Sequence, residues 1–412
     1  MKGFTTRIVH SDRQKTIEHG SLQKPIHATV AYGYDDAREL AAVFQGKQPG
    51  FTYGRQVNPT VEALQDKISR MENGTQTVCF ATGMAAIGTM LFALLRQGDH
   101  FISSSFLFGN TNSLFNSFAV QGIDVSFVDA TSVDAVADAI TPETRLVFVE
   151  TIANPRTQVS ALEEIGALCR ERGLVYVVDN TMTSPFLFQP LSVGASLVVN
   201  SLTKYIGGHG NALGGAITEM AQFDWRKFDN IYDTYKTGGS EKWAITQIKK
   251  KGLRDFGASL APEAAHHLGV GAETLALRME RQCASAQVMA EYLAGHSQVK
   301  AVYYPGMPDH PEHARAKKLF RYPGALFSFE LVADVDIWAF MNALDVIVKS
   351  SNLGDNRTLA IPVAHTIYFE MGAERRASMG IDESLIRISV GIEEPDDLLA
   401  DFDAAFAAVS GD

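Results

Sequence analysis

The 412-residue sequence predicts an α/β protein, with a mostly parallel sheet in a large domain and a smaller α/β domain at the C-terminus. Two observations predict this class. Between residues 61 and 201, short apolar runs alternate with amphipathic helical segments, which is typical of a parallel sheet covered by helices on both faces. After Gly252 a long helical stretch is followed by a second, smaller alternation of strands and helices.

The first sixty residues do not have the pattern of a domain. The stretch from Thr5 to Tyr34 has little hydrophobic periodicity, and Gln45 to Thr60 is rich in turn-forming residues. A segment without a core of its own needs another surface to cover it. We therefore expect residues 1–60 to form an N-terminal arm that contacts a neighbouring subunit.

The large domain is expected over residues 61–255. Its helical segments carry apolar residues at intervals of three or four, whereas its strands are short apolar runs. The predicted helices are 61–72, 84–98, 112–120, 133–139 and 161–173, and the predicted strands are 76–80, 99–104, 124–128, 145–151, 174–180 and 195–201.

The small domain is expected over residues 256–412, with a boundary near 250–260 and no low-complexity linker. Its pattern begins with the longest helical stretch of the chain. The predicted elements are a helix over 271–296, a strand over 325–331, a helix over 334–344 and a strand over 385–393.

Composition and charge exclude several classes of protein. A hydrophobic content of 46% and a charged content of 20% are those of a globular chain. The net charge of −11, without a basic run, argues against a nucleic-acid partner, and no apolar stretch approaches the ~18 residues of a membrane span. The three cysteines are far apart, which supports neither a disulfide framework nor a metal site. We expect a soluble, cytoplasmic chain.

A lysine and an aspartate stand at the ends of two predicted strands. Lys204 follows an apolar strand and precedes five glycines within twelve residues, and Asp179 ends another strand 25 residues upstream. Alone, the lysine would be a solvated side chain and the aspartate a turn former or helix cap. Together they suggest pyridoxal 5'-phosphate, which needs a lysine for its Schiff base and a carboxylate for its ring nitrogen.

A phosphate site is suggested by a helix start and two hydroxyls. Gly83 and Met84 open a predicted helix, whose free amides and dipole favour an anion, although one glycine could equally form a tight turn. Ser201 and Thr203 flank the lysine segment and could add their hydroxyls. Arg55, in the arm, is either a solvated charge or a phosphate ligand that reaches across to another subunit.

These segments together resemble a known family. The motifs are SLTKYIGGHG (201–210), VVDNTMTSP (177–185), TGMAAI (82–87), YGRQVNPT (53–60), ETIANP (150–155), ETLALRMER (273–281) and IRISVGIEE (386–394). In this order, over nearly the whole chain, they resemble the Cys/Met-metabolism family of pyridoxal-phosphate enzymes. That family includes cystathionine γ-synthase, cystathionine and methionine γ-lyases, and O-acetylhomoserine sulfhydrylase.

The resemblance implies a PLP-dependent transferase fold of type I (aminotransferase-like) and a homotetramer that is a dimer of dimers. It implies that the enzyme acts on a small-molecule amino-acid substrate at its γ-carbon, by elimination or by replacement. The site residues that it implies fall into two groups. Cofactor ligands are Lys204, which is also the proton shuttle, Asp179, Gly83, Met84, Ser201, Thr203, Phe108 and, from the adjacent subunit, Tyr53 and Arg55; substrate ligands are Arg387, Asn352, Asn154 and Thr366.

The sequence departs from the family at Phe108, where a tyrosine usually stacks on the cofactor and protonates the leaving group. A phenyl ring can stack but has no proton to give. Either the change is neutral, with Tyr53 taking over the proton transfer, or the leaving group needs little protonation. A carboxylate from an O-acylhomoserine, or the cationic guanidinooxy group of canavanine, meets the second condition better than a thiolate does.

A second departure lies in residues 363–376, where the family often has histidine after Thr366 and this chain has Ile367. Glu370 and Glu374 follow, and they could either favour a cationic substrate or form part of a solvated helix face. Segments 249–262 and 352–359 are most similar to the sulfhydrylase branch.

Three hypotheses on function follow from these features. The leading one is γ-elimination on an oxygen-linked homoserine-type amino acid such as canavanine. The alternative is γ-replacement, as in an O-acetyl- or O-succinylhomoserine sulfhydrylase or a cystathionine γ-synthase. A non-catalytic PLP-binding protein is the alternative of another class, and the retention of Lys204, Asp179 and Arg387 argues against it.

Overall fold

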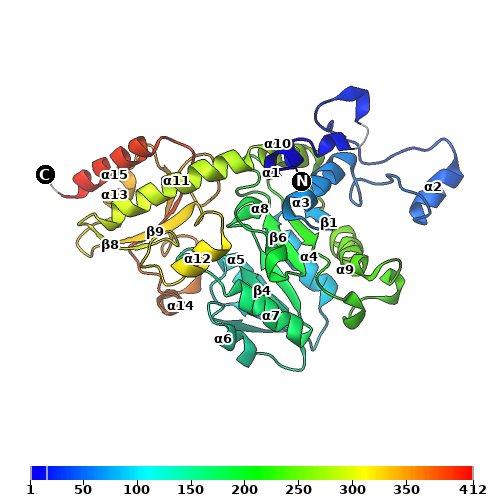
Figure 1. The fold of residues 1–412 in the computed structure, drawn as a ribbon, viewed down its shortest axis with the longest axis horizontal. Coiled ribbons are helices and arrows are strands. Elements are labelled where there is room, and N and C mark those ends of the chain that lie inside the picture. The colour runs from blue at the N-terminus through cyan, green and yellow to red at the C-terminus, as the bar shows by residue number, and fades with distance from the viewer. Residues whose placement is uncertain (1, 15–16, 411–412) are drawn as a thin grey trace.

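The computed structural model describes residues 2–14 and 17–410, and in them the chain forms two sheets. A seven-stranded sheet lies between residues 76 and 219, and a five-stranded sheet lies between residues 299 and 389. Figure 1 shows the larger sheet at the centre and the smaller one at the left, with helix α11 (Leu275–Ala294) running along the top from one toward the other.

The larger sheet is mostly parallel, as the sequence predicts. Its strand order is β1-β7-β6-β5-β4-β2-β3, and only β7 runs antiparallel to its neighbours, β1 and β6. The strands are β1 (Gln76–Phe80), β2 (His100–Ser104), β3 (Asp124–Val128), β4 (Thr144–Glu150), β5 (Val175–Asp179), β6 (Leu197–Ser201) and β7 (Gly215–Glu219).

Both faces of this sheet are buried, which explains why its strands are continuous apolar runs. In β4, Leu146 and Phe148 pack into one hydrophobic cluster, whereas Val147 and Val149 pack into another. Side chains alternate between the two faces of a strand, so a strand covered on both sides needs apolar residues at every position.

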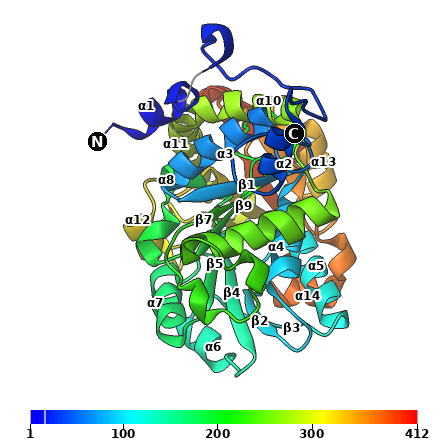
Figure 2. The ribbon, with the colours of Figure 1, turned by 90° about the vertical axis from the view of Figure 1, so that its right-hand side faces the viewer.

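Helices cover the larger sheet (Figure 2), and α3 and α4 are among those that begin at side-chain caps. The Asn58 side chain accepts hydrogen bonds from the amides of Thr60 and Val61 at the start of α3, and Thr82 accepts one from Ala85 at the start of α4. The helices of this part are α3 (Pro59–Glu72), α4 (Gly83–Leu94), α5 (Gly109–Val120), α6 (Val133–Asp138), α7 (Leu162–Arg172), α8 (Ser184–Leu187) and α9 (Trp243–Gln247).

The smaller sheet is mostly antiparallel, with strand order β10-β11-β12-β9-β8. Its strands are β8 (Val299–Tyr303), β9 (Leu326–Leu331), β10 (Val348–Lys349), β11 (Leu359–Pro362) and β12 (Leu385–Ser389). The helices of this part are α10 (Pro262–Glu273), α11, α12 (His313–Leu319), α13 (Ile337–Ala343), α14 (Ala373–Ser378) and α15 (Pro395–Ser410).

Shorter helical segments complete the fold. They are 3-10 turns at Asp12–Gln14, Glu18–Gly20, Pro190–Val193, Trp225–Lys227, Asp233–Tyr235, Ser240–Lys242 and Phe369–Met371, and a π-helical segment at Ile248–Arg254. Within the described residues, none of the helices combines the length and the hydropathy that crossing a membrane requires.

Two differences from the predicted elements have a clear physical reason. The single helix expected over 271–296 is two helices, because the backbone leaves helical geometry at Thr274. Strand β7 was missed, since its glycine-rich start resembles a loop. A side chain at Gly215 would place its Cβ 2.2 Å from the carbonyl oxygen of Thr82, so this strand passes the start of α4 only because it has a glycine there.

Part of the arm, including α2 (Ala37–Phe44), extends away from the rest of the chain (Figure 1). The arm also contains α1 (Phe4–Val9), which packs on α3 through the buried Ile8, whereas α2 has no buried residue. Leu22, Val30 and Phe44 are 74%, 60% and 66% exposed. An arm with this much exposed apolar surface has the property expected of a segment that another subunit covers.

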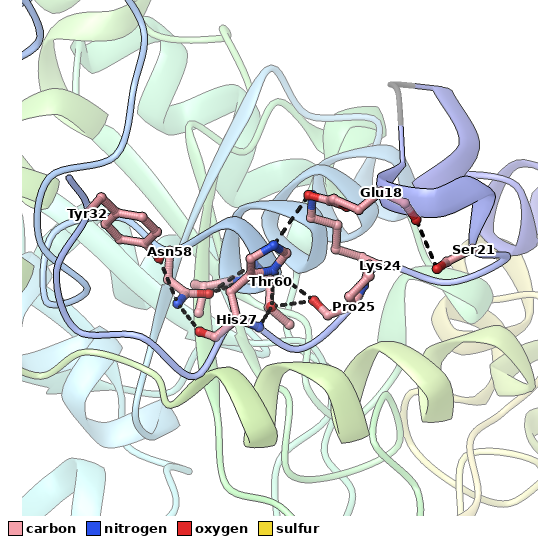
Figure 3. Close-up of polar contacts among 9 residues, drawn as sticks. Glu18, Ser21, Lys24, Pro25, His27, Tyr32, Asn58 and Thr60 are labelled. Atoms are coloured by element: carbon pink, nitrogen blue, oxygen red, sulfur yellow. Dashed lines mark hydrogen bonds and ion pairs between the residues drawn. The ribbon is translucent and has the colours of Figure 1, made fainter. Parts of the chain in front are cut away.

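Polar contacts tie the middle of the arm to the start of α3 (Figure 3). The His27 amide donates to the Thr60 hydroxyl at 2.9 Å, and the Asn58 side chain donates to the His27 carbonyl at 2.7 Å. Glu18 pairs with Lys24 at 2.7 Å and with the His27 ring at 3.3 Å. Residues 18–27 are therefore fixed to the helix that leads into the large sheet.

Candidate active site

A cavity of about 840 Å³ lies where the carboxyl ends of β4, β5 and β6 meet the starts of α4 and α5. This is the edge at which α/β sheets bind ligands. Ten of the site residues that the sequence predicts line this one cavity: Gly83, Met84, Phe108, Asn154, Asp179, Ser201, Thr203, Lys204, Asn352 and Arg387.

Lys204 lies in the turn after β6, and its Nζ donates to Oδ1 of Asn352 at 2.8 Å. Burial, together with the nearby Arg387 guanidinium, lowers the pKa of Lys204 to about 8. Its amine is therefore neutral over much more of the physiological range than an ordinary lysine. A neutral amine is the form that attacks a carbonyl and accepts a proton.

Two carboxyl groups stand side by side at the strand ends. Asp179 ends β5 and pairs in register with Glu150, the last residue of β4. Oδ1 of Asp179 accepts from the Thr181 amide at 2.9 Å, and Oε1 of Glu150 accepts from the Phe108 amide at 3.0 Å. Burial raises both pKa values, that of Glu150 to about 8, where the charge of Asp179 adds to the shift, and that of Asp179 to about 6.

Glu150 was not predicted as a site residue. It stands within the segment ETIANP, and its position at a strand end is the same signal that singled out Asp179. Because the pair resists a double negative charge, Glu150 holds the proton and Asp179 remains the better acceptor for a positively charged N–H donor.

The start of α4 forms an anion cradle. Thr82 caps the helix, and Gly83 approaches Ser201 so closely that an added Cβ would lie 3.0 Å from the Cβ of Ser201. Thr203 lines the same end of the cavity, and its hydroxyl accepts from the Gly214 amide at 3.0 Å. Helix amides, the helix dipole and two hydroxyls are the donor set that a phosphate group requires.

Arg387, on β12 of the smaller sheet, is a buried cation that lines the cavity. It is 1% exposed, and its Nη2 donates to the carbonyls of Asn352 at 2.8 Å and Ser351 at 3.2 Å. Its Nη1 reaches Oδ1 of Asn154 at 3.4 Å, and its Nε has no partner. Burial lowers its pKa to about 10, and among the described residues it forms no ion pair with a carboxylate. A substrate carboxylate would supply the missing anion.

The two positions that depart from the family lie on one wall. Phe108 and Ile367 both line the cavity, and a Cβ added at Gly109 would meet the Ile367 carbonyl at 3.3 Å. Glu370 and Glu374 are exposed and do not line it. The wall that these positions form in the cavity is thus apolar.

Three predicted site residues lie outside the cavity of their own chain. Thr366 is exposed, and its hydroxyl donates to the Pro362 carbonyl at 2.7 Å. Tyr53 is 40% exposed and forms a β-bridge with Ala31 in the arm. Arg55 donates to the Arg254 carbonyl at 2.7 Å, and its guanidinium lies 5.3 Å from the Tyr53 ring.

The residues present fit pyridoxal phosphate. A neutral lysine can bind its aldehyde, an aspartate can accept from its ring nitrogen, and the start of α4 can hold its phosphate. Such a site on a mostly parallel sheet with a second, smaller sheet defines a PLP-dependent enzyme of fold type I.

The chain belongs to the Cys/Met metabolism PLP-dependent enzyme family, whose model matches residues 5–407. It is 36% identical to L-methionine gamma-lyase of Pseudomonas putida, over 99% of this chain and 98% of that protein. It is 33% identical to O-acetyl-L-homoserine sulfhydrylase of Corynebacterium glutamicum, over 99% of this chain and 97% of that protein.

Solved structures agree with this assignment. The cystathionine gamma-lyase of Lactobacillus plantarum, complexed with L-serine, has a TM-score of 0.89 at 30% identity and full coverage of both chains. A chain from Campylobacter jejuni that carries N'-pyridoxyl-lysine-5'-monophosphate has a TM-score of 0.93 at 30% identity, over 98% of this chain and 100% of that one.

These comparisons confirm the predicted family, fold class and cofactor. They also confirm the predicted class of enzyme, a PLP-dependent γ-lyase or γ-replacement enzyme of Cys/Met metabolism that acts on a small amino acid. The hypothesis of a non-catalytic binding protein is set aside.

Proposed function

We propose that the enzyme acts on an oxygen-linked homoserine-type amino acid, with γ-elimination on a canavanine-like substrate as the leading candidate. The observation that carries this proposal is Phe108 on the cavity wall, in place of the family's usual tyrosine. A carboxylate, or a guanidinooxy group with its own positive charge, departs without a proton from this position. A thiolate is a stronger base and gains more from protonation.

Ile367 supports the same proposal. It replaces a second polar side chain of the family, and its backbone lies against Gly109, next to Phe108. Two polar groups are thus missing from the same wall at once, which favours a substrate outside the range usual for thioether enzymes.

The groups of the chain account for binding and proton transfer. Arg387 holds the α-carboxylate, and the neutral amine of Lys204 takes the α-proton. Asp179 accepts from the ring nitrogen of PLP, which supplies an electron sink when it is bound. Loss of a second proton, from the β-carbon, then allows the γ-substituent to leave.

The second candidate is γ-replacement, in which a thiol adds where the oxygen-linked group has left. The similarity to the C. glutamicum O-acetyl-L-homoserine sulfhydrylase favours it. The substrate would then be an O-acetyl- or O-succinylhomoserine, and the product with cysteine would be that of a cystathionine γ-synthase. Elimination and replacement share their first steps, so the same residues serve both.

The arm is proposed to complete the site of an adjacent subunit in a homotetramer made of two dimers. Tyr53 and Arg55 lie outside the cavity of their own chain, and the arm that holds them exposes apolar side chains. An arginine from a neighbour would add charge-assisted hydrogen bonds to the phosphate. Thr366 retains its proposed role only if substrate binding moves it toward the cavity.

The domain division and the compartment are also proposals. An arm over 1–60, a large domain over 61–255 and a small domain over 256–412 would place each sheet in a domain of its own. Cys79, Cys169 and Cys283 are buried free thiols, which suits the reducing cytoplasm.

Product analysis tests the proposed substrate class. The purified enzyme is incubated with canavanine, O-acetylhomoserine, O-succinylhomoserine, cystathionine or methionine, with and without sulfide, and the products are identified by mass spectrometry. Elimination from canavanine should release hydroxyguanidine and give 2-oxobutanoate and ammonia, so 2-oxobutanoate is the expected product. Homoserine would instead show that water replaces the guanidinooxy group at the γ-carbon. Turnover of methionine or cystathionine in preference to every oxygen-linked compound would contradict the proposal, whereas homocysteine formed only with sulfide would select the second candidate.

A further inference from the structure

A carboxyl group lies buried beneath the cofactor site, outside the cavity itself. Glu72 is the last residue of α3 and is fully buried. Its Oε1 accepts from Nδ2 of Asn200 at 2.6 Å and from Nδ2 of Asn180 at 3.0 Å, and its Oε2 lies 3.3 Å from the same Nδ2 of Asn180. Among the described residues it has no ion pair, so two amide groups are its only side-chain partners.

These two asparagines directly flank the predicted cofactor ligands. Asn180 follows Asp179 at the end of β5, and Asn200 precedes Ser201 at the end of β6. One side chain of α3 therefore contacts the two neighbouring strand ends from which a ring-nitrogen ligand and a phosphate ligand project.

The same two strand ends are joined by other contacts. The Asn180 amide donates to the Val199 carbonyl at 2.9 Å. The Thr181 amide donates to Asp179, and the Thr181 hydroxyl accepts from the Ser201 amide at 2.8 Å. A shift of Asn180 would thus be passed to Asp179 and Ser201 together.

A buried carboxyl without a cation is costly, and here the burial raises the pKa of Glu72 to about 7 while the two amides oppose that shift. Removing it would take away the acceptor of the Asn200 side-chain amide and would leave the Asn180 side-chain amide with the Phe188 carbonyl, at 3.2 Å, as its acceptor. A buried donor that loses its acceptor costs free energy. This costly arrangement lies where the cofactor site requires the ends of β5 and β6 to keep a fixed register.

We propose that Glu72 is a positioning residue for pyridoxal phosphate, which acts through Asn180 and Asn200 to hold Asp179 and Ser201 in the geometry that the cofactor requires. The role is independent of the substrate. A variant that lacks the Glu72 carboxyl should therefore lose more free energy of PLP binding than free energy of unfolding. The reason is that the two strand ends, and not the whole sheet, lose a contact.

A matched control is present in the same sheet. Glu219 ends β7, is equally buried, and accepts from the Ala221 amide at 3.1 Å. In the register of the sheet it lies opposite Leu197, whereas the other end of β7, Gly215, lies opposite Ser201. Glu219 is therefore a buried carboxyl at the end of the sheet away from the cofactor site.

The experiment compares Glu72→Ala and Glu72→Gln with Glu219→Ala and Glu219→Gln. For each apoprotein, the dissociation constant of PLP is measured by equilibrium dialysis, and the thermal midpoint is measured separately. Outer-shell partners of metal ligands typically contribute about tenfold or more to metal affinity, and by analogy Glu72→Ala should weaken PLP binding by at least about tenfold. Glu72→Gln keeps one oxygen for both amides and should show a smaller loss.

The Glu219 variants should lose thermal stability to a similar extent while their PLP affinity stays within about twofold of wild type. The visible absorbance spectrum of bound PLP, titrated with pH, should change in the Glu72 variants and not in the Glu219 variants. Equal PLP affinities in the two series would overturn the proposal. Because Glu72→Gln preserves the shape of the side chain, it provides the comparison if Glu72→Ala does not fold.

Discussion

The strand ends and the arm are held in opposite ways. Asp179 and Ser201 end strands that are buried on both faces and tied to their neighbours by hydrogen bonds across the sheet, and Lys204 lies in the turn that follows Ser201. Tyr53 and Arg55 belong to a segment whose helix α2 buries no side chain. The groups proposed to do the chemistry are thus fixed by the fold of one chain, whereas the groups proposed to complete the phosphate site depend on a second chain.

This contrast has a physical basis. A covalent cofactor needs its lysine, its ring-nitrogen ligand and its phosphate cradle within small tolerances, which a sheet core supplies. An arm that is anchored by α1, by contacts at the start of α3 and by the Arg55 side chain, and that leaves α2 unburied, cannot supply them alone. It can, however, make binding depend on assembly, because a cation from a neighbour reaches the site only in the oligomer.

Among the residues at the strand ends, Lys204 should have the largest effect on turnover when its side chain is removed. In Lys204→Ala, turnover should fall by at least about 100- to 10,000-fold, because general acid–base catalysis and covalent attachment are lost together. Steady-state kinetics measure the effect, with the exposed Lys227→Ala as the control that keeps wild-type rates. Retained turnover in Lys204→Ala would show that another group is the base.

Arg387→Ala tests the proposed binding site of the substrate carboxylate. Truncating one partner of a buried charge pair costs about 2–5 kcal/mol, so KM should rise by roughly 30-fold to several thousandfold. The measurement is KM for the substrate identified by product analysis, with kcat measured alongside. An unchanged KM would place the substrate carboxylate elsewhere.

The sequence alone predicts that Lys204 and Asp179 lie at neighbouring strand ends. Lys204 and Asp179 follow apolar runs that can only be buried strands, and the ends of parallel strands share one edge. Glu150 and Glu72 were missed for different reasons. The role of Glu150 depends on its register with Asp179, and Glu72 belongs to a helix whose sequence shows only an amphipathic pattern.

The arm was predicted because the first sixty residues lack the hydrophobic periodicity of a domain. The roles of Tyr53 and Arg55 were predicted from the family resemblance. No periodicity links Arg55 to a cavity in another chain. The strand β7 was missed because Gly214 and Gly215 have the composition of a loop, although their lack of side chains is what lets the strand pass α4. Close backbone approach is a tertiary property that local sequence does not report.

A subunit-mixing experiment tests the arm directly. Arg55→Ala and Lys204→Ala should each be impaired alone. When the two variants are unfolded together and refolded, about half of the dimers are mixed, and each mixed dimer has one intact site. The mixture should therefore recover up to about a quarter of wild-type activity. The control is each variant refolded alone. If mixing restores nothing while mixed oligomers form, Arg55 acts within its own chain or not at all.

Phe108→Tyr should have the smallest effect and sharpens the proposed substrate class. The added hydroxyl supplies a proton donor on the apolar wall, so the kcat/KM for a thioether such as methionine should rise relative to that for an oxygen-linked substrate. Leu in place of Phe108 is the control for loss of stacking. If the ratio does not change in Phe108→Tyr, Phe108 serves packing only.

The most direct test of the cofactor site is to trap PLP on the apoprotein with borohydride over a pH series and to map the labelled peptide by mass spectrometry. The label should lie on Lys204, and its rate of formation should rise with pH and level off above about pH 8, since the neutral amine is the reactive form. A label on another lysine, or a rate that continues to rise toward the ordinary pKa of lysine, would contradict this account of the site.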